Sequence, residues 1–306
     1  MVSIVIATFN RPKLLKRAIA SALMQDFTDI EIIVTDDGAD DRASKVCAEF
    51  GDERIKFFKN TNHTKSPNGN KNNGFDKVNG EFVCLLDDDD ELLSASAISE
   101  CLVFLRSGYE CVFADCLCEK YGVVLETVAG RSPYTSSGDM SRVDYHCGRI
   151  NGEFFKIFSR KFIDDFRFDE RSFGGENELY IRFFDSHVYY IKKPLYLYRI
   201  ARDDSATKNA TKHALSVAHA YLKTAMMTQQ IAAVHAPQFL ATQYKQAAYY
   251  SKMGGDYTMM LRCIFKSLRV KILPSTLIFL AISPLPNTLL SALSRIRVSI
   301  KKRFGL

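Results

Sequence analysis

Three short apolar runs in the first third of the chain each end in a cluster of polar residues. The runs are Val2–Ile6, Ile30–Val34 and Phe82–Leu86. The clusters that follow them are, in order, Thr8, Asn10 and Arg11; Asp36 and Asp37; and Asp87, Asp88, Asp89 and Asp90. Helical patterns separate the runs, which is typical of βαβ units and a mostly parallel sheet. Because the carboxyl ends of parallel strands meet at one edge, the three clusters are predicted to line a single crevice.

The rest of the chain continues this pattern and then changes character. Helices are expected after Pro12 with Asn10 as the cap, at about 41–50, at 95–105 and, with a break at Ala236-Pro237, over 206–253. Further strands are expected at 55–58, 111–114, 123–128, 154–158 and 188–191. The stretch 60–74 is polar and rich in Asn and Gly, and 130–149 is predicted to be a mobile loop.

The run of aspartates after Leu86 suggests a metal site. Like charges packed this closely repel one another, so the run adds nothing to the stability of the fold. Carboxylate oxygens are the ligands that Mg²⁺ and Mn²⁺ prefer. An EF-hand is excluded, because Leu92 and Ile98 stand where that loop needs glycine and glutamate. The alternative interpretation is a solvated acidic turn.

A nucleotide diphosphate would suit the three clusters together. Asp36 and Asp37 can accept hydrogen bonds from a base, Arg11 can pair with phosphate, and a metal at the aspartates can neutralise the diphosphate. The chain has neither G-x-x-x-x-G-K nor G-x-G-x-x-G. A P-loop enzyme and a Rossmann dehydrogenase are therefore not expected.

Four motifs in order resemble the family 2 glycosyltransferases of the GT-A fold. Ser3–Pro12 (SIVIATFNRP) is similar to the opening strand and nucleotide-binding turn of that family, and Glu31–Asp40 (EIIVTDDGAD) to its second strand. Lys71–Gly74 resembles its Arg-Asn-x-Gly element, and Leu86–Asp90 its Asp-x-Asp metal motif. The resemblance covers roughly residues 2–200. It implies an α/β GT-A domain, Rossmann-like, over 1–204 and a helical region over 205–306.

The resemblance also implies roles for the polar residues. Asp87 and Asp89 would form the metal pair, with Asp87 nearer the ribose and Asp89 the direct ligand of Mn²⁺ or Mg²⁺. Thr8, Asn10, Arg11, Asp36, Asp37, Lys71, Asp88 and Arg199 would bind the donor, with Asp37 at the uracil of a UDP-sugar. Lys71 stands where the family has arginine and lacks its bidentate fork. Asp90 would lie on the acceptor side, as would His146 in the loop at 130–149.

An inverting transfer also needs a carboxylate that takes the proton of the acceptor hydroxyl. The family carries this base in an acidic motif ahead of a helix, and here the segment reads Gly174-Gly-Glu-Asn-Glu-Leu-Tyr-Ile-Arg182. Glu176 falls at the position of the family's aspartate, and Gly175 replaces its glutamate. Glu176 is the candidate base and Glu178 the second choice. Alternatively, Glu176 only caps the following helix.

The basic charge of the protein lies at its C-terminal end. The net charge is +6, yet residues 257–306 hold nine basic residues and no acidic one, so residues 1–256 carry −3. Residues 272–286 are apolar, but too short and too proline-broken to span a bilayer. An interfacial segment on an anionic membrane and a segment packing on the domain or on a second subunit both suit this pattern. Nucleic-acid binding is not expected, because the basic residues lack interleaved aromatics.

The location and the function follow as expectations. Cys116 and Cys118 lack the partners of a zinc site and are interpreted as structural, and no basic region precedes the first strand. A cytoplasmic protein, peripheral at the inner face of the plasma membrane, is expected. It would be a metal-dependent inverting glycosyltransferase that moves a sugar from a UDP-sugar to a glycan or lipid-linked glycan acceptor in surface-polysaccharide synthesis, either as a monomer or as an oligomer. The alternative is a catalytically silent module that binds a sugar nucleotide or a polysaccharide.

Overall fold

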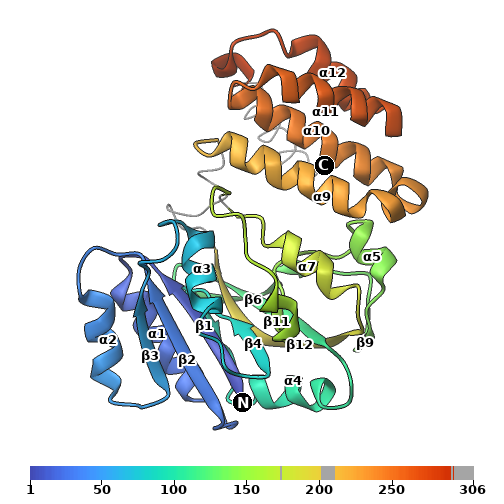
Figure 1. Cartoon of the computed structure of the whole chain (residues 1–306). Coiled ribbons are helices and arrows are strands. Elements are labelled where there is room, and N and C mark those ends of the chain that lie inside the picture. Colours follow the sequence, from blue (N-terminus) through green and yellow to red (C-terminus); the bar gives the residue numbers. More distant parts are fainter. Residues whose placement is uncertain (173, 201–210, 291, 293–306) are drawn as a thin grey trace. The chain divides into compact units, whose positions relative to one another are not determined.

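The computed structural model describes residues 1–172, 174–200, 211–290 and 292. The chain divides into two compact units, Met1–Ala206 and Thr207–Leu306. The expected boundary between residues 204 and 205 lies outside the described residues. Figure 1 shows the helices and strands of both units, coloured along the sequence.

The first unit is built on a mixed sheet with strand order β3-β2-β1-β4-β11-β6-β12-β5. The strands on this path are β1 (Val2–Thr8), β2 (Ile30–Asp36), β3 (Ile55–Lys59), β4 (Phe82–Leu85), β5 (Glu91–Leu92), β6 (Cys111–Lys120), β11 (Phe155–Ser159) and β12 (Val188–Ile200). β7 (Val123–Val128) pairs with β6, β9 (Gly138–Asp139) pairs with β12, and β8 (Gly130–Arg131) pairs with β10 (Asn151–Gly152). The helices are α1 (Pro12–Leu23), α2 (Arg42–Phe50), α3 (Pro67–Phe75), α4 (Ala97–Leu105), α5 (Arg142–His146), α6 (Lys161–Asp164) and α7 (Asn177–Phe183).

The register of the first strands brings their carboxyl ends together. β1 runs parallel to β2 with Thr8 opposite Asp36, and parallel to β4 with Val5 opposite Leu85. The polar residues that follow the three strands therefore lie along one edge of the sheet. This confirms the predicted parallel pairing of the first strands and their shared edge, while β11 and β5 pair antiparallel with their neighbours.

Both faces of the sheet are buried at β1, β2 and β4, which explains why these strands are apolar without alternation. Ile4, Ile32 and Cys84 belong to a core cluster that includes residues of α1, α2 and α4. Val5 and Ile33 belong to a second cluster on the other face, with residues of α3 and α7. Successive residues of a strand point to opposite faces, so one apolar run supplies both cores.

The structure corrects several expectations. The polar stretch 60–74 contains helix α3, and 130–149 contains β8, β9 and α5 instead of one loop. β6 and β12 are longer than the expected strands at 111–114 and 188–191. Asn10 is not the cap of α1: Arg11 occupies that position, and Asn10 has a φ of 58° with its side chain accepting a hydrogen bond from Arg42.

The second unit is helical. Its described helices are α9 (Ala214–His235), α10 (Pro237–Met253), α11 (Tyr257–Val270) and α12 (Pro274–Ile282). The predicted break at Ala236-Pro237 is the single-residue connection between α9 and α10. Ala247, Cys263, Ile264 and Phe279 form part of the core that joins α10, α11 and α12. Across the described ranges, no helix has both the length and the hydropathy needed to cross a bilayer.

Candidate active site

Helix α3 carries the centre of the site and is buried from Asn68 to Phe75. Ser66 caps it by accepting a hydrogen bond from the Gly69 N–H at 3.0 Å, and Pro67 takes the first helical position. A helix buried all round needs partners for its polar side chains. The pair Ser66-Pro67 was the sequence signal for the start of this helix. The helix was not predicted because its sequence lacks an apolar stripe.

The asparagines of α3 supply those partners on two sides. Asn70 donates to the Thr8 carbonyl of β1 at 2.9 Å, and Asn73 donates to the Thr35 hydroxyl of β2 at 2.5 Å. On the other side, Asn72 accepts a hydrogen bond from the Phe168 N–H at 2.8 Å and donates one to the Phe168 carbonyl at 2.9 Å. Asn68 donates to the carbonyl of residue 169 at 2.9 Å and to that of residue 174 at 3.0 Å. The helix thereby joins the sheet edge to the segment that leads to Glu176.

Lys71 stands between the two sides and pairs with two carboxylates. Its ammonium forms an ion pair with Glu176 and lies 3.3 Å from Asp87. Burial lowers the pKa of Lys71, but Asp87 and Glu176 outweigh burial and raise it above its usual value. The Lys71 charge in turn lowers the pKa of Asp87. Glu176 occupies the cap position of α7 without a side-chain capping bond, so its carboxylate pairs with Lys71 instead.

The four aspartates after β4 divide into two kinds. Two of them are buried. Asp88 is 3% exposed and accepts hydrogen bonds from Thr8 at 2.7 Å and from Arg11 at 2.9 Å. Asp90 is 2% exposed and accepts hydrogen bonds from the Arg199 N–H at 2.8 Å and from the Tyr196 hydroxyl at 3.1 Å. Burial, and then the Asp87 charge, raises the pKa of Asp90. Asp90 therefore attaches β12 to the end of β4, and its place on the acceptor side stays a prediction.

The other two aspartates remain accessible. The side chain of Asp87 is 50% exposed and that of Asp89 is 14% exposed. Among the described residues, no three His, Cys, Asp or Glu side chains form a ready-made metal cage. Mg²⁺ is usually held by one or two carboxylates together with substrate phosphates. The two accessible aspartates are the donor set that such a shared ion requires.

The residues expected at the nucleotide lie along the same edge. Asp36 accepts from the Gly38 N–H at 2.8 Å and from Lys59 at 2.7 Å. Asp37 accepts from the side-chain amide of Asn60 at 2.7 Å, and burial raises the pKa of its carboxyl. Asp37 is 7% exposed. Its contact with a uracil stays a prediction.

Three further candidates differ from expectation or stay untested. The Arg199 guanidinium forms a two-point contact with Glu119 at 2.9 Å and a contact with Glu91 at 3.1 Å, so two carboxylates already compensate its charge. His146 is buried in α5, and neither of its ring nitrogens has a hydrogen-bond partner among the described residues, so the expected mobile-loop position is wrong, while its role toward an acceptor stays a prediction. Glu178 lies in the first turn of α7, two residues after Glu176.

A buried lysine and its ion pair near the site were missed by sequence reasoning. Lys156 of β11 is 8% exposed, pairs with Glu153 at 2.8 Å and lies 4.1 Å from the ring centroid of Tyr180. The charge of Lys156 lowers the pKa of Asp87, and that of Glu153 raises the pKa of Asp90. A single lysine inside the apolar run 154–158 was the signal that could have revealed it.

The chain belongs to glycosyl transferase family 2. The model of that family matches residues 3–167, and the structure has the GT-A fold. A GalNAc(5)-diNAcBac-PP-undecaprenol beta-1,3-glucosyltransferase of Campylobacter jejuni is 40% identical over 98% of both chains. The protein is therefore a glycosyltransferase.

One further relative and one solved structure extend the comparison. An Escherichia coli UDP-Glc:alpha-D-GlcNAc-diphosphoundecaprenol beta-1,3-glucosyltransferase is 27% identical over 40% of this chain and 50% of its own. Staphylococcus aureus TarS in complex with UDP-GlcNAc has a TM-score of 0.60 at 13% identity, covering 86% of this chain and 88% of that one. At this identity the structural likeness supports the fold alone.

Proposed function

We propose that the protein transfers glucose from UDP-glucose to a hydroxyl of an undecaprenyl-diphosphate-linked oligosaccharide, with inversion and with help from a divalent metal. The proposal draws on the Campylobacter and Escherichia relatives, whose names state β-1,3-glucosyl transfer to lipid-linked glycans. A β product from the α-linked donor UDP-glucose requires inversion at the anomeric carbon. The reaction would serve the synthesis of a bacterial surface glycan.

The observation that carries the chemistry is the placement of Lys71 between Glu176 and Asp87. In the proposed reaction the acceptor hydroxyl forms a bond to the anomeric carbon while the bond from that carbon to the UDP oxygen breaks. The Glu176 carboxylate takes the hydroxyl proton. Lys71 orients that carboxylate through their ion pair.

Asp87 and Asp89 would hold the cation. A bound Mn²⁺ or Mg²⁺ would neutralise charge that develops on the leaving diphosphate. Asp88, which lies between Asp87 and Asp89 in the chain, would keep Thr8 and Arg11 in place, because its carboxylate accepts a hydrogen bond from each of these two residues. Asp37 would accept from the N–H of the uracil.

Two substitutions test this assignment with a measured transfer rate and a measured UDP affinity. Glu176→Gln is expected to lower kcat by about 10³-fold and to leave UDP binding unchanged, because a general base contributes 10²–10⁴-fold. Asp89→Ala is expected to abolish Mn²⁺-dependent UDP binding. Glu126→Gln, an exposed glutamate of β7, is the matched control and should change neither quantity.

Two outcomes would count against the proposal. A Glu176→Gln rate within fivefold of wild type would move the base to Glu178 or elsewhere. Tight UDP binding without sugar transfer, tried with a panel of UDP-sugars and lipid-linked acceptors, would favour the silent binding module.

The second unit would bind the membrane that holds the lipid-linked substrate through a surface on and after helix α11. Tyr257, Leu261 and Phe265 follow one another at every fourth position of α11, and each is at least 44% exposed. Ile272 and Ile278 of the next segment are 67% and 60% exposed. The basic residues Arg262, Lys266, Arg269 and Lys271 lie in the same stretch. Apolar side chains beside basic ones are what an interfacial helix presents to anionic lipid.

Liposome sedimentation tests this surface. Binding to anionic vesicles is expected to weaken as salt rises, because each basic residue near the surface contributes about 1 kcal/mol. Phe265→Asp should lower binding, and Val234→Asp, which changes an exposed valine of α9, should not. Equal binding of Phe265→Asp and wild type at low salt would assign α11 to packing or oligomer formation. The basic residues 295, 297 and 301–303 lie outside the described residues.

A further inference from the structure

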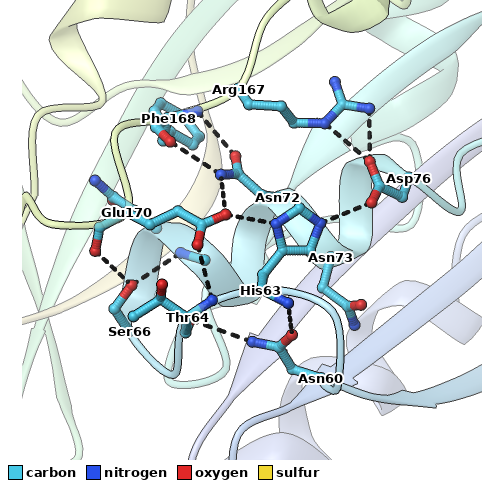
Figure 2. A network of polar contacts seen from close by, with 12 residues as sticks. Asn60, His63, Thr64, Ser66, Asn72, Asn73, Asp76, Arg167, Phe168 and Glu170 are labelled. Carbon is cyan, nitrogen blue, oxygen red and sulfur yellow. Dashed lines mark hydrogen bonds and ion pairs between the residues drawn. The ribbon is translucent and has the colours of Figure 1, made fainter.

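His63 bridges two carboxylates from opposite sides of its ring (Figure 2). Its Nε2 lies 2.7 Å from Asp76, the residue after the last turn of α3, and its Nδ1 lies 2.5 Å from Glu170. The two carboxylates are distant in the chain and come from different segments. The imidazole is the one described group that contacts both of them, and its side chain is 17% exposed.

Glu170 is held by more than the imidazole. Its carboxylate accepts from the Thr64 N–H at 2.8 Å and from Asn72 at 3.2 Å, and its carbonyl accepts from the Ser66 hydroxyl at 3.0 Å. Three residues earlier, the Arg167 guanidinium contacts Asp76 at 2.7 Å. The segment 167–170 is thereby attached to α3 and to the loop before it.

The position of Glu176 depends on how the chain before it is attached to α3. Gly174 and Gly175 immediately precede Glu176 and have φ values of 80° and 103°. Glycine adopts positive and negative φ values about equally readily, so these two residues do not themselves fix the direction of the chain. Two attachments to α3 therefore hold the chain upstream of Glu176: the segment 167–170 and the hydrogen bond from Asn68 to the carbonyl of residue 174.

We propose that His63 is a positioning residue for sugar transfer: its bridge between Asp76 and Glu170 holds residues 167–170 against α3 and thereby helps to place Glu176 beside Lys71. The inference rests on the proposed role of Glu176 as the base. His63 touches neither the proposed base nor the proposed metal ligands, and it acts through the segment.

The bridge requires a protonated imidazole to donate from both nitrogens. Burial lowers the pKa of His63, but Asp76 and Glu170 outweigh burial and raise it above its ordinary value. The charged groups around the ring are these two carboxylates and Arg167, which contacts Asp76. A raised pKa means that the bridge is fully formed below about pH 6.5 and is lost as the pH rises through the raised value.

Hydrogen exchange and kinetics test the proposal in the full chain. In His63→Gln the amides of 167–176 are expected to exchange about tenfold faster, because a local anchor has been removed. The kcat is expected to fall about tenfold, while the UDP affinity stays within threefold, because a misplaced base slows chemistry more than binding. The wild-type loss of protection at alkaline pH should be absent in the variant. The control is His187→Gln, an exposed histidine of the same unit.

The outcomes separate the inference from the proposed function. Unchanged exchange at 167–176, or equal effects in His187→Gln, overturns the inference. A loss of UDP affinity that matches the loss of kcat also overturns it, because the residue would then be merely structural. If His63→Gln does not fold, Asp76→Asn removes one of the two carboxylates that His63 contacts, and hydrogen exchange and kinetics are measured on that variant instead. If Glu176→Gln stays active while His63→Gln frees the segment, the assignment of the base fails and the attachment itself stands.

Discussion

Helices α1 and α3 both pack on the sheet, yet opposite kinds of contact hold them. α1 buries Leu15, Ala18, Ile19 and Ala22 in an apolar core and leaves charged residues at the surface. α3 is buried on all sides, and asparagines and one lysine make its principal contacts. Apolar burial is non-directional, whereas each buried amide requires a partner at a set distance and angle.

This difference shows which helix can carry chemistry. A helix like α1 tolerates small shifts, since its contacts depend on area and volume. α3 cannot shift without leaving buried donors and acceptors unpaired, which costs about 1–3 kcal/mol for each group. A lysine placed on α3 is consequently held in register with Asp87 and Glu176. Four substitutions test this comparison.

The largest effect is expected from Lys71→Met. The substitution removes the charge between Glu176 and Asp87 and leaves both carboxylates without their shared partner. Turnover is expected to fall by about 10²-fold or more, because the base loses the ion pair that orients it. Steady-state kinetics of the folded variant would measure it. A rate within fivefold of wild type would show that Lys71 is a bystander.

Ile19→Ala tests the apolar helix. Ile19 is fully buried, so its truncation is expected to lower the free energy of unfolding by about 2–5 kcal/mol. The kcat per folded molecule should stay unchanged, because Ile19 contributes apolar burial to the core and makes none of the polar contacts described for the site. Urea unfolding and active-site titration give the two quantities. A kcat reduced more than threefold would break the distinction between the helices.

Asn72→Ala tests the polar helix. The change leaves the N–H and C=O of Phe168 without their side-chain partner. A loss of about 1–3 kcal/mol in unfolding free energy is expected, together with a fall in kcat that Ile19→Ala does not show. Asn62→Ala, at an exposed asparagine of the preceding loop, is the control. Lost stability with unchanged kcat would mean that α3 does not position the site.

Lys16→Ala should have the smallest effect. Lys16 of α1 pairs with Glu49 of α2 at 2.6 Å, and both side chains are more than half exposed. Exposed pairs contribute little, so the unfolding free energy should change by less than about 1 kcal/mol. Thermal unfolding at low and high salt would measure it. A larger change would show that polar contacts on α1 matter as much as those on α3.

Much of the first unit was accessible from the sequence. β1, β2 and β4, the helix after Pro12 and the single parallel edge follow from apolar runs and their polar ends. The division of the aspartates into buried Asp88 and Asp90 and accessible Asp87 and Asp89 did not follow. Four identical neighbouring side chains carry no local signal that separates them, because their partners lie on other segments.

The sequence by itself determined the class of fold and the edge at which the chemistry lies, because apolar periodicity and the ends of strands are local properties. Only the tertiary structure decided how the site is assembled. Lys71 and Glu176 are 105 residues apart, and His63 and Glu170 are 107 apart. A hydrogen bond or ion pair depends on distance and angle after folding, so such partners cannot be read from spacing along the chain. The helix that joins them, α3, is polar, and its stability comes from those same distant partners.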